Sequence, residues 1–129
     1  MSQLNLTKIG RVAVPTDDSE RSLQFYRDTL GFEVQADETF ADGQMRWIEV
    51  TPAGGGTAIA IAPPPPGKPT AVETGIIIES KDIEADHATL KDAGIDVDPE
   101  IARYGPPVPP MFWFRDPSGN SLMIVEPLR

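Results

Sequence analysis

The sequence predicts an α+β fold built from two copies of one βαβββ module. One observation is a repeated phrase: Met-x-Trp and an apolar residue, then a glycine-containing turn and an apolar run ending in proline. It occurs at residues 45–64 and again at 111–127. The other is a repeated helical pattern, at 16–31 and 81–94, that begins near an aspartate and stops at a glycine. We therefore expect the same order of strands and helix twice.

The first module is expected over residues 9–62. It opens with the strand IGRVAV, and a helix follows that Asp17 or Asp18 caps and Gly31 ends. Helical spacing predicts one buried stripe on this helix: Leu23, Tyr26 and Leu30. Three strands complete the module, written FEVQAD, MRWIEV and TAIAIA.

The second module is expected over residues 73–127, after a stiff proline-rich linker at 63–69. It repeats the order with the strand TGIIIES, a helix from Asp82 to Gly94, and the strands IDVD, MFWFRD and SLMIVE. Three blocks match in the same order: GFEV with GIDV, MRWI with MFWF, and the run from Gly-Thr to Pro with that from Asn-Ser to Pro. The chain of 129 residues is thus expected to form a single duplicated domain.

Composition excludes several classes of site. The absence of cysteine rules out disulfides, thiolate metal sites and cysteine nucleophiles. A formal net charge of −9 repels phosphate backbones, so we expect no nucleic-acid partner. No apolar run reaches the roughly 20 residues of a membrane span, and the N-terminus lacks the apolar region of a signal peptide. We expect a cytoplasmic protein with no membrane partner.

Residues 11–34 and 114–126 resemble the entry segment and the closing hairpin of the vicinal oxygen chelate superfamily. That superfamily includes glyoxalase, extradiol dioxygenases, fosfomycin-resistance enzymes and bleomycin-resistance binding proteins. The resemblance runs from about Ile9 to Pro127, and these motifs carry it: Phe25-Tyr26, Leu30-Gly31-Phe32 and Asp116-Pro117-x-Gly119-Asn120. It implies curved mixed sheets whose concave faces enclose a shared cavity, and members of the family usually form homodimers.

Enzymes of this superfamily place metal ligands, usually His or Glu, on the first and last strand of each module. In this chain the resemblance maps these positions onto Arg11, Ile59 (or Ala60 in a shifted alignment), Gly75 and Met123. None of these side chains suits zinc, iron or magnesium. The single histidine, His87, is expected to pack on its helix. We therefore expect neither a metal site nor a cofactor.

Arg11 is the most informative candidate for ligand binding. Strand alternation places it on the face opposite Val12, where the resemblance puts a ligand histidine. Its guanidinium could bind an anionic ligand, or it could form an internal salt bridge, for example with Glu79. Glu79 is also the weak candidate for a catalytic base, whereas Glu49 is expected to be solvated near the sheet edge.

Aromatic side chains supply the other candidates. Trp47 and Trp113 occupy equivalent positions in the two modules, and a hairpin pairing Arg115 with Ser121 would set Trp113 opposite Met123, facing the cavity. Each tryptophan could equally be core filling. Phe40 and the proline-rich loop that carries Arg103 and Tyr104 could border the cavity mouth or act as spacers.

The sequence favours a metal-independent small-molecule binding protein similar to bleomycin-resistance proteins, sequestering an antibiotic or metabolite. The ligand is expected to be aromatic or cationic, because the walls are apolar and the surface acidic. The alternative is a glyoxalase-like or dioxygenase-like enzyme, a lyase, isomerase or oxidoreductase. It would use atypical metal ligands or cofactor-free acid–base chemistry.

Overall fold

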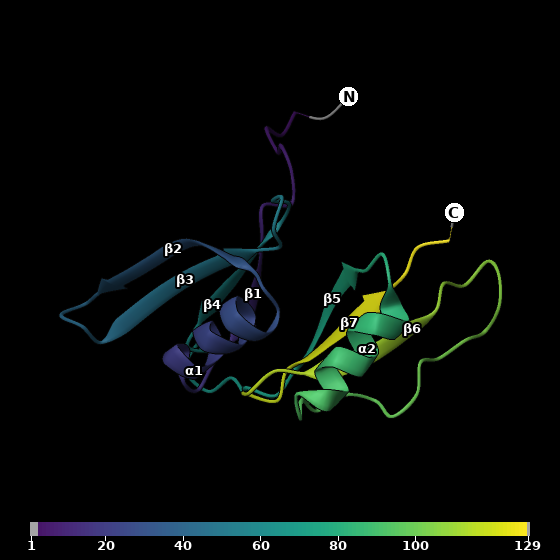
Figure 1. The fold of residues 1–129 in the computed structure, drawn as a ribbon. Helices are drawn as coiled ribbons and strands as arrows, with labels where there is room; N and C mark the ends of the chain where they lie inside the picture. Colours follow the sequence, from purple (N-terminus) through teal and green to yellow (C-terminus); the bar gives the residue numbers. More distant parts are fainter. Residues whose placement is uncertain (1–2, 129) are drawn as a thin grey trace.

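The computed structural model describes residues 3–128, which form two sheets and two helices (Figure 1). The first half contains β1 (Arg11–Pro15), α1 (Ser19–Gln24), a π-helical turn η1 (Phe25–Thr29), β2 (Glu33–Phe40), β3 (Met45–Thr51) and β4 (Ala58–Ala62). The second contains β5 (Glu73–Glu79), α2 (Ile83–Asp92), β6 (Met111–Arg115) and β7 (Ser121–Val125). The predicted α+β class is confirmed.

The two sheets have the same core topology. The first has the order β1-β4-β3-β2, with β1 parallel to β4 and the other pairs antiparallel. The second has the order β5-β7-β6, with β5 parallel to β7. In each module the helix after the first strand provides the crossover that a parallel pair requires. In Figure 1 these helices, α1 and α2, lie in front of their sheets.

One predicted strand is wrong. Residues 95–98 were expected to form a full strand, but they contribute an isolated bridge between Val97 and Phe114. A second bridge joins Ala102 to Met111 farther along β6. Two backbone hydrogen bonds accompany the first bridge, from Asp98 N to Trp113 O at 2.9 Å and from Arg115 N to Asp96 O at 2.8 Å. The Trp113 amide also donates to Asp98 Oδ2 at 3.2 Å. A segment this short and polar has too few apolar side chains to hold a continuous strand.

The predicted helix ends are confirmed, and one turn differs. Asp18 and Asp82 cap the helices through the amides of Arg21 and Ala85, and Gly31 and Gly94 have φ values of +76° and +77°. After α1 the chain widens into η1, where the Leu30 amide donates to Phe25 O. This π-turn buries Phe25 beside Tyr26, although simple helical spacing had not placed Phe25 in the core.

One apolar cluster joins the two modules. It combines buried side chains of sheet one, such as Ile61, with Phe112, Phe114 and Leu122 of sheet two. The ring of Phe25 lies 6.1 Å from that of Phe114, so the first module's helix region packs directly on the second sheet. Each sheet therefore has a helix-packed face, buried in this cluster, and an opposite face that we call the helix-free face.

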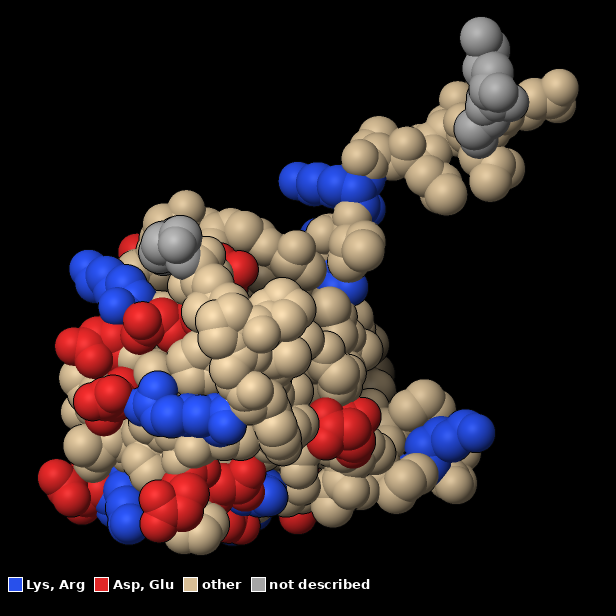
Figure 2. Space-filling model, turned by 90° about the vertical axis from the view of Figure 1, so that its right-hand side faces the viewer, with Lys and Arg blue, Asp and Glu red and all other residues tan. Residues whose placement is uncertain are grey.

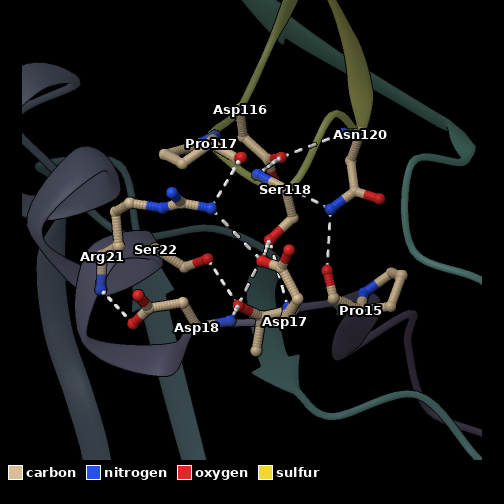
Figure 3. Close-up of polar contacts among 10 residues, drawn as sticks. Pro15, Asp17, Asp18, Arg21, Ser22, Asp116, Pro117, Ser118 and Asn120 are labelled. Atoms are coloured by element: carbon tan, nitrogen blue, oxygen red, sulfur yellow. Dashed lines mark hydrogen bonds and ion pairs between the residues drawn. The ribbon is translucent and has the colours of Figure 1, made fainter.

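A polar network at the β6–β7 turn fastens the modules together (Figure 3). Asp116 is buried and accepts the amides of Ser118 and Asn120 on Oδ1, at 3.0 and 2.9 Å. Its Oδ2 accepts the hydroxyl of Tyr26 at 2.8 Å. From the same turn, Asn120 donates to Pro15 O at 2.7 Å. The turn thus holds both β1 and the helix that follows it.

We expect Tyr26→Phe to lower the free energy of unfolding by about 1–3 kcal/mol, because the buried Asp116 carboxylate loses a donor. Burial and the Asp116 charge raise the pKa of Tyr26 well above 10. A raised pKa means that this stability is present below about pH 10 and is lost at higher pH, as the unfolded chain ionises first. Urea unfolding at pH 7 and pH 10.5 measures both effects.

Tyr104, the other tyrosine of the chain, is the matched control because its side chain is exposed. Tyr104→Phe should leave stability unchanged. Equal losses in the two variants would contradict the role of the Tyr26 hydroxyl.

Candidate functional site

Strand register decides which side chains share the helix-free face of sheet one. Val12 pairs with Ile59 and Val14 with Ile61, and the buried members of these pairs lie in the apolar cluster. Ile59 therefore belongs to the helix-packed face, and its predicted place beside Arg11 is wrong. Ala58 pairs in register with Arg11, and alternation along β4 puts Ala58 and Ala60 together on the opposite face. Of Ile59 and Ala60, it is Ala60 that shares the helix-free face with Arg11.

Arg11, Glu49 and Trp47 form a network on this face. Arg11 Nε donates to Glu49 Oε2 at 2.7 Å, and the Trp47 indole Nε1 donates to the same oxygen at 2.7 Å. Arg11 thus has an internal salt bridge, but with Glu49 rather than with Glu79. The Glu49 side chain is only 14% exposed, so the expectation that it is solvated is wrong.

Small residues on β4 make room for this ion pair. Arg11 pairs in register with Ala58, and Glu49 pairs with Ala60, so β4 lies between the two charged residues. Ala58 and Ala60 are buried although they face away from the helix. We infer that the Arg11–Glu49 pair crosses over them, which larger side chains would prevent.

The network holds Glu49 in its ionised form. The indole of Trp47 and, second, the guanidinium of Arg11 lower the pKa of Glu49 below its usual 4.5. Arg11 uses only Nε for Glu49, and its side chain is 60% exposed. A guanidinium carries further N–H donors, so this face offers donors to a ligand next to an indole ring.

Phe40 and Met45 extend the same face. They pair with each other across the β2–β3 hairpin, two residues from the Trp47–Glu38 pair, and both are exposed. The predicted candidates Arg11, Phe40 and Trp47 therefore lie on one face of one sheet. Exposed aromatic and thioether side chains on a single sheet face are characteristic of a contact surface.

The second sheet presents a comparable helix-free face. Trp113 pairs with Met123 and Arg115 with Ser121, as the sequence predicts, while Phe112 and Phe114 are buried on the opposite side. Ile77 of β5 pairs with Met123 and is exposed. Trp113 and Met123 are half-buried on this face.

The remaining candidates lie apart from these faces or at their ends. Arg103 forms an exposed ion pair with Glu84 of α2 at 2.8 Å, and Tyr104 is exposed in the proline-rich loop. Glu79 ends β5, is exposed, and has no ion-pair partner among residues 3–128. In the described part of the chain, the contacts of Arg11 and Trp47 are with Glu49 and not with Glu79.

A hollow lies at the junction of the two sheets. It has a volume of about 820 Å³, lies between β1, β4 and β5, and includes Ile59, Gly75 and Glu79 among its lining residues. Arg11, Trp47 and Trp113 do not line it. The Arg11 network therefore lies outside this hollow.

The positions onto which the resemblance maps metal ligands carry side chains that do not suit a divalent metal ion. The Arg11 guanidinium is positively charged and has no lone pair to offer a metal ion. Ala60 and Gly75 have no ligating atoms in their side chains, and the Met123 thioether suits copper(I). Within residues 3–128, no three His, Asp or Glu side chains gather as a metal site would require. His87 bonds to Asp98 O at 2.7 Å and packs edge-on against Phe112.

Sequence reasoning missed Glu49 as a site residue. A usable signal was present, because Trp47 and Glu49 stand two residues apart on one strand and so share a face. Recognising Arg11 as its partner required the order of the strands, since β4 separates β1 from β3.

Comparisons with known proteins agree with this fold. The sequence model of the Glyoxalase/Bleomycin resistance protein/Dioxygenase superfamily matches residues 8–124. A Bacillus subtilis protein called uncharacterized protein YetH is 28% identical over 124 residues, 94% of this chain and 99% of its own length.

Two solved structures are similar over nearly their whole length. TnmS3, an antibiotic binding protein from Streptomyces sp. CB03234, is 28% identical with a TM-score of 0.81, over 98% of this chain and 100% of its own. A superfamily member from Sphaerobacter thermophilus DSM 20745 is 30% identical with a TM-score of 0.84, over 94% of this chain and 98% of its own. No helix in residues 3–128 is long and apolar enough to cross a membrane.

We expect the indole N–H resonance of Trp47 to shift when Glu49 is protonated, with a midpoint below pH 4.5. A depressed pKa means that the ion pair persists above about pH 4.5 and is lost as the pH falls through the lower, folded-state value. A two-dimensional ¹H–¹⁵N titration measures this directly. Trp113 is the internal control, and Glu49→Gln should abolish the low-pH step. If the low-pH shift of the Trp47 indole resonance were the same in Glu49→Gln as in the wild type, the network would be contradicted.

Proposed function

Because this chain belongs to the Glyoxalase/Bleomycin resistance protein/Dioxygenase superfamily, we propose that it binds a small aromatic molecule without a metal ion. The observation that carries the proposal is the Arg11–Glu49–Trp47 network on the helix-free face of sheet one. In this proposal the fixed guanidinium takes the place of a metal ion as the group that receives ligand oxygen atoms.

The donor set argues against a metal-dependent reaction. Arg11, Ala60, Gly75 and Met123 include no carboxylate or imidazole, and a second copy of the chain would add only the same four residues. The nearby carboxylate of Glu49 is committed to Arg11 and Trp47. A hard divalent cation would need at least three oxygen or nitrogen ligands that these positions lack.

Aromatic stacking supplies the main contact in the proposed complex. Trp47 and Phe40 offer exposed ring surfaces, and the exposed donors of Arg11 lie beside the indole. A planar ligand could stack on Trp47 while its oxygen atoms accept from Arg11. The antibiotic binding by TnmS3 suggests antibiotics as the first class of ligand to screen, with sequestration as the biological result.

A homodimer would complete such a site. The helix-free faces leave several large apolar side chains exposed within one chain: Phe40, Met45, Trp47 and Ile77. In a two-fold dimer, sheet one of one copy could face sheet two of the other, with Trp47 and Trp113 on opposite walls. This arrangement would bury the exposed side chains and enclose a ligand between them.

We expect ligand binding to survive complete removal of metal. Metal content is measured by plasma mass spectrometry on protein that is purified without chelators and then re-exposed to divalent ions. Ligand affinity is measured on the same protein before and after EDTA treatment. Less than one metal in ten chains and an unchanged Kd are the expected results. About one tightly bound metal per chain, with chelator-sensitive turnover of the ligand, would favour the enzyme alternative.

We expect Trp47→Ala to weaken ligand binding at least about tenfold, which corresponds to about 1.4 kcal/mol of lost contact. For the wild-type protein, ligand at a hundred times its Kd should raise the free energy of unfolding by about 2.7 kcal/mol, which is visible as a rise in Tm. Val108→Ala is the matched control, because Val108 and Trp47 are 37% and 36% exposed. Equal ligand affinity in the two variants would show that Trp47 does not contact the ligand.

A further inference from the structure

Two alanines leave part of the helix-free face of sheet one uncovered. The Arg11–Glu49 ion pair passes over Ala60, which is only 1% exposed. On the same face, Ala13 of β1 is exposed and Ala62 of β4 is half-buried. A methyl side chain fills little space, so a shallow trough remains beside the ion pair. We call it the alanine trough, after Ala13 and Ala62 that form its floor.

Trp47 lies at one end of the alanine trough. Ile48 pairs with Ile61, so continuing this antiparallel register by one residue sets Trp47 beside Ala62. On its other side Ala62 pairs with Pro15 of β1. Neighbouring strands are about 4.8 Å apart, so Trp47 and Pro15 lie roughly 10 Å from each other across the sheet.

An apolar hollow of about 270 Å³ lies at the other end of the trough, and we call it the proline hollow. Ala13 and Pro15 of β1 line it on one side, and residues of the segment 63–72 line it on the other. Five of its eight lining residues are prolines, which have no backbone N–H. Lys68 is the only lining residue with a polar side chain. The hollow therefore offers mainly hydrocarbon surface and few hydrogen-bond donors.

Hydrogen bonds fix the walls of the proline hollow. The buried Asn120 side chain donates to Pro15 O at 2.7 Å (Figure 3) and accepts the Val72 amide at 3.1 Å. The Lys68 amide closes a turn by donating to Pro65 O at 3.0 Å. Because the φ angle of proline is also fixed, the hollow is shaped before a ligand arrives. A preformed hollow lowers the entropic cost of binding.

Charged side chains are sparse on the side of the molecule opposite the helices. In Figure 2 they gather on the left, where the helices lie, and few lie on the right of that view. Beside the trough, Arg11 and Glu49 are paired with each other. Lys68 is exposed, so its ammonium group can stay hydrated while its hydrocarbon stem borders the hollow. An uncharged part of a ligand fits this environment.

We propose that the ligand carries a hydrocarbon arm that crosses the alanine trough and enters the proline hollow. The inference rests on the proposed function, because it extends the same site and narrows the class of ligand. The aromatic part stacks on Trp47, its oxygen atoms accept from Arg11, and the arm lies over Ala62 and Ala13. The distance from Trp47 to Pro15 exceeds the width of a single aromatic ring, so a ligand that contacts both is elongated.

Three probes that differ only in the arm test the inference: 2-naphthoic acid, 6-butyl-2-naphthoic acid and 6-(3-hydroxypropyl)-2-naphthoic acid. The two arms have equally many non-hydrogen atoms, but one ends in a hydroxyl. The Kd of each probe is measured on the full-length protein by a two-dimensional ¹H–¹⁵N titration. The butyl arm should lower Kd at least about tenfold, because its methylenes leave water. The hydroxypropyl arm should lower Kd less than about threefold, because its hydroxyl loses hydration in an apolar hollow.

A filled hollow should remove the gain from the butyl arm. In Ala13→Leu the added side chain occupies the space of the arm, so butyl should lower Kd less than about twofold. Ala53→Leu is the matched control, because Ala53 is exposed in the turn between β3 and β4 and does not line the hollow. There the gain should stay at about tenfold or more. Thermal unfolding checks that each variant is folded.

Every other result overturns the inference. Equal Kd values for 2-naphthoic acid and its butyl derivative would exclude the arm, and the proposed function would stand if Trp47→Ala still abolished binding. A butyl gain that persists in Ala13→Leu would place the arm elsewhere, and its loss in both leucine variants would show an indirect effect. Equal gains from the two arms would contradict the apolar character of the hollow. If none of the three probes bound, the proposed function and the inference would both be wrong.

Discussion

The fold depends on a buried carboxylate. Asp116 lies in the β6–β7 turn, where two backbone amides, the Tyr26 hydroxyl and the Asn120 amide group donate to it. A buried carboxylate that lost these donors would be strongly destabilising. The same turn reaches β1 through Asn120 and the α1 cap region through Ser118. Because its partners belong to both modules, this one turn sets how the two sheets lie against each other.

The two modules have diverged around the same backbone plan. In the second module the hairpin turn is polar and fastened, whereas in the first it is glycine-rich and borders the hollow between the two sheets. On the helix-free faces, Trp47 and Trp113 remain equivalent, but Glu49 in one module corresponds to Arg115 in the other. Arg115 pairs with Asp98 at 2.9 Å instead of with a residue on the first strand. The duplicated scaffold thus supports two different surfaces.

The Arg11–Glu49 ion pair on sheet one places a fixed positive charge on the helix-free face. Arginine stays protonated at all relevant pH values, so it provides a permanent positive charge without a metal. The alanines of β4 leave space for that side chain to reach Glu49, and the indole of Trp47 occupies the same carboxylate oxygen. Because Glu49 is held by two donors, the exposed N–H groups of Arg11 are positioned before any ligand arrives.

Local chemistry in the sequence determined the duplication, the capping of both helices by Asp18 and Asp82, and the hairpin register that sets Trp113 opposite Met123. Each depends on residues close together in the chain. Only the tertiary structure decided that Ala60 rather than Ile59 shares a face with Arg11, and that Glu49 is the partner of Arg11. Arg11 and Glu49 are 38 residues apart in the sequence, and a shift of one residue in the strand pairing would exchange the two faces of the sheet. The place of the hollow between the two sheets had the same origin, because it follows from how the modules pack.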